Sequence, residues 1–118
     1  MRPTFVVTTA SLLLLGAGVA EAAGSTQLAE TGGFLLGNAH RCGVLTERVE
    51  RAGKIIHDLI VAASFDSTEE AAADSRFAEI FLANAFPDQN GDALIPPCKA
   101  VIAQFGRLEQ HHQQAGMH

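Results

Sequence analysis

Two cysteines, Cys42 and Cys98, are the side chains of this chain best suited to covalent chemistry. In a short chain that is exported from the cytosol, two thiols far apart in the sequence normally pair as a structural disulfide, because the compartment outside the cytosol is oxidising. A free thiol near a helix N-terminus is instead activated as a nucleophile or redox group, and Cys98 stands where a helix is expected to begin. The chain has no Cys-x-x-Cys motif. We therefore predict a Cys42–Cys98 disulfide, with a redox role for Cys98 as the alternative.

Oxygen-bearing side chains alternate in the segment 88–95, which reads Asp-Gln-Asn-Gly-Asp-Ala-Leu-Ile. The spacing of Asp88, Asn90 and Asp92 lets all three turn onto one hard cation, which takes oxygen ligands at about 2.4 Å. Asn-Gly and Asp also favour tight turns. The segment therefore predicts either a weak calcium site or a polar turn between two helices.

This spacing resembles the start of an EF-hand calcium loop. Leu94 stands where such a loop offers a backbone carbonyl, and Ile95 matches the apolar position that follows. Two positions depart from the pattern: Ala93 replaces the glycine of the sharp turn, and Lys99 replaces the bidentate glutamate. The resemblance therefore implies weak calcium binding at most.

Histidines gather near the C-terminal end, at His111, His112 and His118. Imidazoles bind zinc, nickel or copper, but adjacent residues on a helix point about 100° apart and do not converge on one ion. We therefore expect a solvated tail there. His40 and His57 are expected to be surface or hydrogen-bonded histidines, with His57 in a charged helix flank that also contains Glu50, Lys54 and Asp58.

No pattern typical of an enzyme occurs in the sequence. It contains no Gly-x-Ser-x-Gly elbow, no phosphate-binding glycine loop, no His-Glu-x-x-His zinc motif and no Cys-x-x-Cys-His haem motif. A small helical bundle also leaves little room for a substrate pocket once its core is filled. We therefore expect a protein that is not an enzyme, with no resident cofactor.

Residues 1–22 have the pattern of a secretory signal peptide. Arg2 provides the positive start, an uncharged apolar stretch follows, and Ala20-Glu21-Ala22 supplies the small residues that a signal peptidase recognises. The strongly apolar part is short for a membrane anchor, which is the rival interpretation. We predict cleavage before Ala23 and export, with the bacterial periplasm favoured over full secretion.

Residues 23–118 then form a single small domain. The net charge of −5 and the lack of a basic stripe argue against nucleic acid and against a membrane surface after cleavage. Trp and Tyr are absent, which removes the side chains most used to stack on sugars. Of the kinds of binding partner considered, another protein is therefore the one that we expect.

Apolar residues recur at helical spacing in four segments, and no stretch alternates as a strand would. The first segment runs from about Gln27 to Arg41, after cap candidates at Ser25 and Thr26, and three glycines weaken it. The second begins at Thr46 as N-cap. Its apolar stripe comprises Val49, Ala52, Ile56, Leu59, Ile60 and Ala63.

The third segment opens with a capping box between Ser67 and Glu70 and ends at Pro87. Its buried face is expected to comprise Ala73, Phe77, Ile80, Phe81 and Ala85. The fourth begins at Pro96-Pro97, and its polar end, about 110–118, is expected to fray. The apolar side of this segment comprises Cys98, Val101, Ile102, Phe105 and Leu108.

Together these patterns predict an all-α fold, a small four-helix bundle cross-linked by one disulfide after a cleaved signal peptide. The disulfide would join the end of the first helix to the start of the last. Closing a loop of that size stabilises a domain by about 4 kcal/mol.

We expect such a protein to act by binding, as an interaction, accessory or chaperone-like module. In size, disulfide and helical content it is similar to the small periplasmic acid-stress chaperones, although it shares no motif with them. A chaperone of that kind would loosen as its carboxylates become protonated, exposing Phe77, Phe81 and Phe105. Weak calcium binding through 88–95 is the alternative function.

Overall fold

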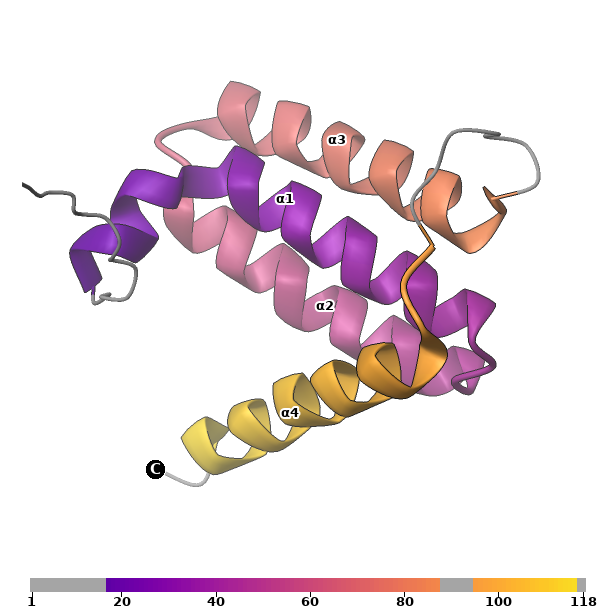
Figure 1. Cartoon of the computed structure of the whole chain (residues 1–118). Helices are drawn as coiled ribbons and strands as arrows, with labels where there is room; N and C mark the ends of the chain where they lie inside the picture. The colour runs from indigo at the N-terminus through magenta and orange to yellow at the C-terminus, as the bar shows by residue number, and fades with distance from the viewer. Residues whose placement is uncertain (1–16, 88–94, 117–118) are drawn as a thin grey trace, which may run out of the picture.

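The computed structural model describes residues 17–87 and 95–116. They form four helices: α1 (Ala17–Arg41), α2 (Thr46–Ala63), α3 (Ser67–Ala85) and α4 (Cys98–Gly116). No strand occurs within these two ranges. Helix α1 lies between α2 and α3 and also contacts α4 (Figure 1). The predicted all-α fold and helical bundle are confirmed.

Gly24 interrupts α1 near its start, with a φ of 68° that only glycine adopts readily. The part of α1 that packs in the bundle therefore begins at Ser25, two residues earlier than predicted. The Ser25 side chain is buried and its hydroxyl donates a hydrogen bond to Glu69 of α3 (2.7 Å). Residues 1–16 lie outside the described residues, so the signal peptide and its cleavage before Ala23 stay predictions.

The glycines of α1 allow it to approach its neighbours closely. A Cβ on Gly33 would lie 2.8 Å from the backbone oxygen of Phe77, and one on Gly32 would lie 2.7 Å from the side chain of Ile56. These glycines weaken an isolated helix, but in the bundle Gly33 permits close approach to the backbone of α3, the helix with which α1 packs most extensively, and Gly32 leaves room for the Ile56 side chain of α2. The glycines thus lower the helix propensity of α1 but allow its close packing against α2 and α3.

The predicted N-caps of α2 and α3 are each displaced by one residue. Asp66, not Ser67, caps α3, and its carboxylate accepts a hydrogen bond from the backbone N–H of Glu69 (2.8 Å). Asp66 has the extended backbone of an N-cap residue (φ −154°, ψ 177°), and its negative charge is also favourable at a helix N-terminus. Helix α2 has Leu45 at its N-cap without a side-chain hydrogen bond, so Thr46 is its first helical residue.

The core collects the apolar faces of all four helices. Leu59 and Ile102 are exceptions to the predicted faces, because both are more than two-fifths exposed. Leu28, Leu35, Phe77, Phe81 and Leu108 are partly buried against the core. The buried members are Ala29, Leu36, Ala39, Val49, Ala52, Ile56, Ile60, Ala73, Val101 and Phe105.

A disulfide joins Cys42, just after α1, to Cys98, the first residue of α4. The Cα atoms lie 5.5 Å apart, which is ordinary disulfide geometry, and the predicted pairing is confirmed. Helix α4 continues to Gly116, into the polar segment where fraying is expected, and the fraying itself stays a prediction. None of the described helices is both long and apolar enough to cross a membrane.

Candidate functional site

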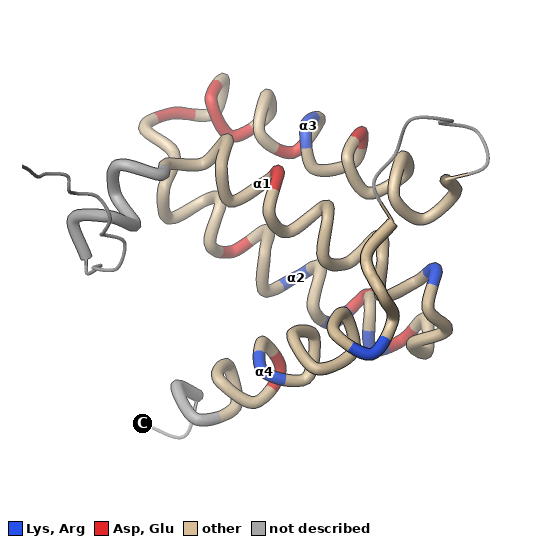
Figure 2. Tube along the Cα trace, viewed as in Figure 1, with Lys and Arg blue, Asp and Glu red and all other residues tan. Residues whose placement is uncertain are grey.

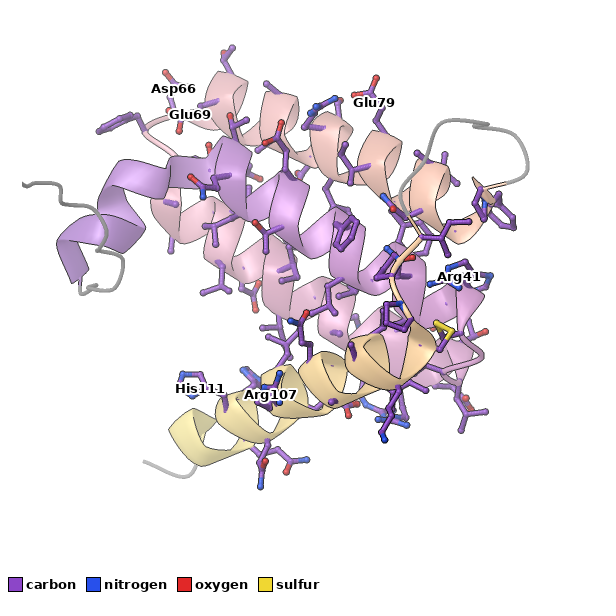
Figure 3. The ribbon with its side chains drawn as sticks, in the orientation of Figure 1. Arg41, Asp66, Glu69, Glu79, Arg107 and His111 are labelled. Atoms are coloured by element: carbon purple, nitrogen blue, oxygen red, sulfur yellow. A yellow bond between two sulfur atoms is a disulfide. The ribbon has the colours of Figure 1, made fainter. Side chains whose placement is uncertain are left out.

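Helix α4 is attached to the rest of the fold mainly at its N-terminal end. The disulfide fixes Cys98 to the end of α1, and Arg41 donates a hydrogen bond to the backbone oxygen of Pro96 (2.8 Å). Figure 3 shows Arg41 beside the disulfide. The chain entering α4 is therefore held both covalently and by a charged side chain.

A buried asparagine positions that arginine. Asn38 is 1% exposed, and its side-chain oxygen accepts a hydrogen bond from Nε of Arg41 (3.0 Å). Its amide nitrogen donates to the backbone oxygen of Phe34 and to the side-chain oxygen of Asn84 in α3 (3.1 Å). Since buried polar groups need partners, this network links α3, α1 and the segment that precedes α4.

One ion pair holds α4 farther along its length. Arg48 of α2 donates two hydrogen bonds to the carboxylate of Glu109, at 3.0 and 2.5 Å. Its guanidinium also lies over the ring of Phe105, 5.4 Å from the ring centre, within reach of a cation–π interaction. These contacts fix the middle of α4 against α2.

The ion pair also changes the acidity of Glu109. Its hydrogen bonds from Arg48 hold the pKa of the Glu109 carboxyl below the ordinary value of 4.5. Partial burial acts in the opposite direction but is outweighed, and the positive charges of Arg48 and Arg51 lower the pKa further. Glu109 is therefore charged at neutral pH, and its contact with α2 depends on that charge.

Beside this ion pair, a groove of about 390 Å³ runs between α2 and α4. Helix α4 diverges from α2 towards its C-terminal end (Figure 1), which leaves the groove open. Side chains of both charges line the groove together with two apolar residues, Ala52 and Ile55. The polar lining residues are Arg51, Lys54, Asp58, Glu109, His112 and Gln113. Such a lining suits an amphipathic segment better than a single small ion.

The sequence did not indicate this groove. Lys54 and Asp58 were assigned to a solvated flank of α2, and His112 to a solvated tail. The structure brings them together because α4 folds back along α2 from the disulfide. One feature of the sequence could have indicated the groove: the helical spacing of Arg51, Lys54, Ile55 and Asp58 places these residues on one side of α2.

The other predicted site residues have different outcomes. Asp88, Asn90 and Asp92 lie outside the described residues, as does His118, so the calcium interpretation stays a prediction. His40 packs between the rings of Phe81 and Phe86, whose centres lie 6.1 and 5.7 Å from its own. Both cysteines form the disulfide, and the alternative of a redox role for Cys98 stays a prediction.

No known protein family, curated protein or solved structure matches this chain, so the residues described above are the evidence for its function.

Proposed function

We propose that the protein is exported and acts by binding an apolar or amphipathic segment of another protein, in a chaperone-like manner, at the junction of α2 and α4. The observation that carries the proposal is the way α4 is attached. A disulfide fixes one end, the Arg48–Glu109 pair holds the middle, and the groove beside that pair is open. The signal-like pattern of residues 1–22 supports export.

The ion pair between Arg48 and Glu109 supports the proposal that acid regulates the position of α4. The pKa of Glu109 is lowered in the folded state, so the ion pair contributes stability above the carboxyl's unfolded pKa. That contribution is lost as the pH falls through the lowered pKa. Protonation of Glu109 leaves the Arg48 guanidinium without its anionic partner, which weakens the attachment of the middle of α4 to α2 and favours its movement away from α2.

Movement of α4 would uncover the surface that the partner binds. Val101 and Phe105 are buried side chains of α4, and Val49 and Ala52 are buried side chains of α2 in the same core cluster. Their exposure creates an apolar surface with charged residues of both signs along its edge. Because the disulfide does not titrate in this range, α4 stays attached and can close again when the pH rises.

Hydrophobic-dye binding between about pH 7 and about pH 2 tests the opening step. Wild-type protein is expected to bind more dye as the pH falls, and Glu109→Gln is expected to bind dye already at neutral pH. Glu79→Gln is the matched control, because Glu79 pairs with Arg76 on the exposed side of α3. Equal dye binding by both variants at neutral pH would contradict a special role for Glu109.

Suppression of client aggregation tests the function itself. An enzyme that unfolds and aggregates at about pH 3 is mixed with the protein, and light scattering is followed. The wild type is expected to lower the scattering in proportion to its concentration. Scattering that stays unchanged at an excess of the protein would rule out the chaperone-like function while leaving the acid opening intact.

A further inference from the structure

A cluster of metal-ligating side chains lies on the junction of α2 and α3, away from the groove. His57 of α2 and Glu70 and Asp74 of α3 each offer one ligand atom, and these atoms all lie within 4.8 Å of one another. Nδ1 of His57 is 3.2 Å from a carboxylate oxygen of Asp74. Two helices that are consecutive in the chain thus bring one imidazole and two carboxylates together.

We propose that His57, Glu70 and Asp74 form a binding site for one divalent transition-metal ion of the zinc class. Imidazole and carboxylate are ordinary zinc ligands, at about 2.0–2.2 Å from the ion. The imidazole disfavours calcium and magnesium, which take oxygen ligands. Three protein ligands leave a fourth position for water or for a side chain of another protein.

The geometry allows the three ligands to close around an ion. Ligands at zinc distances in a tetrahedral site lie about 3.3–3.6 Å from one another. His57 Nδ1 and the Asp74 carboxylate oxygen, 3.2 Å apart, are already close to that range. No pair of ligand atoms in the cluster is separated by more than 4.8 Å, so the longest separation needs to shrink by at most about 1.5 Å. The side chains of His57 and Asp74 are 50% and 41% exposed, and no core packing fixes their rotamers. Side-chain rotation is therefore enough to form the site, without movement of either helix.

The charge distribution also favours a cation at this place. Glu70 and Asp74 lie four residues apart on α3, where like charges repel on a helix surface. Acidic residues gather along the first half of α3 (Figure 2), where Asp66 and Glu69 precede the cluster. Arg76, the next basic residue of α3, instead pairs with Glu30 and Glu79. A bound dication would convert the repulsion within the cluster into attraction.

Isothermal titration of the disulfide-intact protein with zinc tests the site. The wild type is expected to bind one zinc ion. Removing a residue that is hydrogen-bonded to a metal ligand typically weakens metal binding by about 10–100-fold. His57→Ala removes a ligand itself, so it is expected to weaken zinc binding at least about tenfold. Glu70→Gln is expected to weaken binding in the same direction, and it provides a second variant should His57→Ala fold poorly.

The matched control is the double variant His111→Ala and His112→Ala, which removes two exposed histidines of α4. It is expected to bind zinc as the wild type does. Visible absorption of the cobalt-loaded protein gives a second readout, since a nitrogen–oxygen site of four ligands has a stronger spectrum than free cobalt.

Three outcomes would overturn the proposal: no zinc binding by the wild type at sub-millimolar zinc, binding that survives in both His57→Ala and Glu70→Gln, or binding that is lost only in the α4 double variant. None of these outcomes bears on the dye and aggregation measurements at α4, so the two proposals fail independently.

Discussion

Gly37 of α1 lies directly against the backbone of Phe81 in α3. A Cβ atom placed on Gly37 would stand 2.5 Å from the carbonyl oxygen of Phe81, closer than carbon and oxygen atoms approach without repulsion. The atom that it would meet belongs to the backbone of a helix, so it cannot rotate away. The spacing of α1 and α3 therefore depends on the missing side chain.

Gly37→Ala is expected to destabilise the fold by about 1–3 kcal/mol, because overpacking a tight contact forces the backbone to shift. Gly106→Ala is the matched control, since nothing lies within 4 Å of a Cβ at that position of α4. It is expected to stabilise by up to about 1 kcal/mol through helix propensity. Urea unfolding measures both, and a Gly37→Ala protein as stable as the wild type would contradict the close packing of α1 and α3.

Removing the disulfide is expected to release α4 before the other helices unfold. The double variant Cys42→Ser and Cys98→Ser loses about 4 kcal/mol in the chain-entropy estimate for a loop of this length. Helix α4 packs less extensively on α1 than α2 and α3 do, so it has the fewest other contacts to retain it. Hydrogen exchange of peptides from 98–113 is expected to accelerate more than that of α1. If hydrogen exchange accelerated equally in all four helices, α4 would not be the helix that detaches first.

Asn38→Ala is expected to cost about 1–3 kcal/mol, because it removes the hydrogen bond that the buried Asn38 side chain accepts from Arg41 and the one that it donates to Asn84. A double-mutant cycle with Asn84→Ala isolates the hydrogen bond between the two asparagines. The expected coupling is at least about 0.5 kcal/mol, as is typical of residues in one network. Strictly additive effects in chemical denaturation would show that the two amides act separately.

The stability difference between wild type and Glu109→Gln is expected to depend on pH. Since the folded-state pKa of Glu109 is lowered, the wild type is the more stable protein at neutral pH. The difference is expected to disappear as the pH falls through that lowered pKa, because the wild-type carboxyl then becomes neutral as well. Thermal melts at several pH values between about 7 and about 2 measure this. A difference that is constant over the range would mean that the side chain acts by packing.

Glu79→Gln serves as the control for this titration. Glu79 also pairs with an arginine, but its side chain is 69% exposed, and solvent screens such a pair strongly. Its substitution is expected to leave the melting temperature nearly unchanged at every pH. A shift as large as that of Glu109→Gln would indicate a general charge effect.

Local patterns in the sequence correctly predicted much of the fold. Helical periodicity located all four helices, and the stripe of α2 was correct at Val49, Ala52, Ile56 and Ile60. The pairing of Cys42 with Cys98 followed from their number and spacing. The N-cap of α3 was wrong by one residue, because Asp66 and Ser67 are both good caps and only backbone geometry selects between them.

The contacts between helices could not be predicted in this way. The sequence predicts His57 in a flank with its neighbours along α2, whereas in the structure its ring lies 3.2 Å from a carboxylate oxygen of Asp74 in α3. The sequence likewise presents the glycines of α1 only as a weakness, whereas Gly37 sets the approach of α3. Helical periodicity shows which face of a helix is buried, but it does not show which helix covers that face.

Local sequence patterns were therefore enough to locate the four helices and most of their apolar faces and to pair the two cysteines. Those properties depend on residues within a few turns of one another, or on two thiols with no other partner. The packing of the helices is what brings Arg48 to Glu109, opens a groove beside them and places His57 near two carboxylates. These contacts depend on the angle and distance at which the helices pack, which the whole set of side chains determines together.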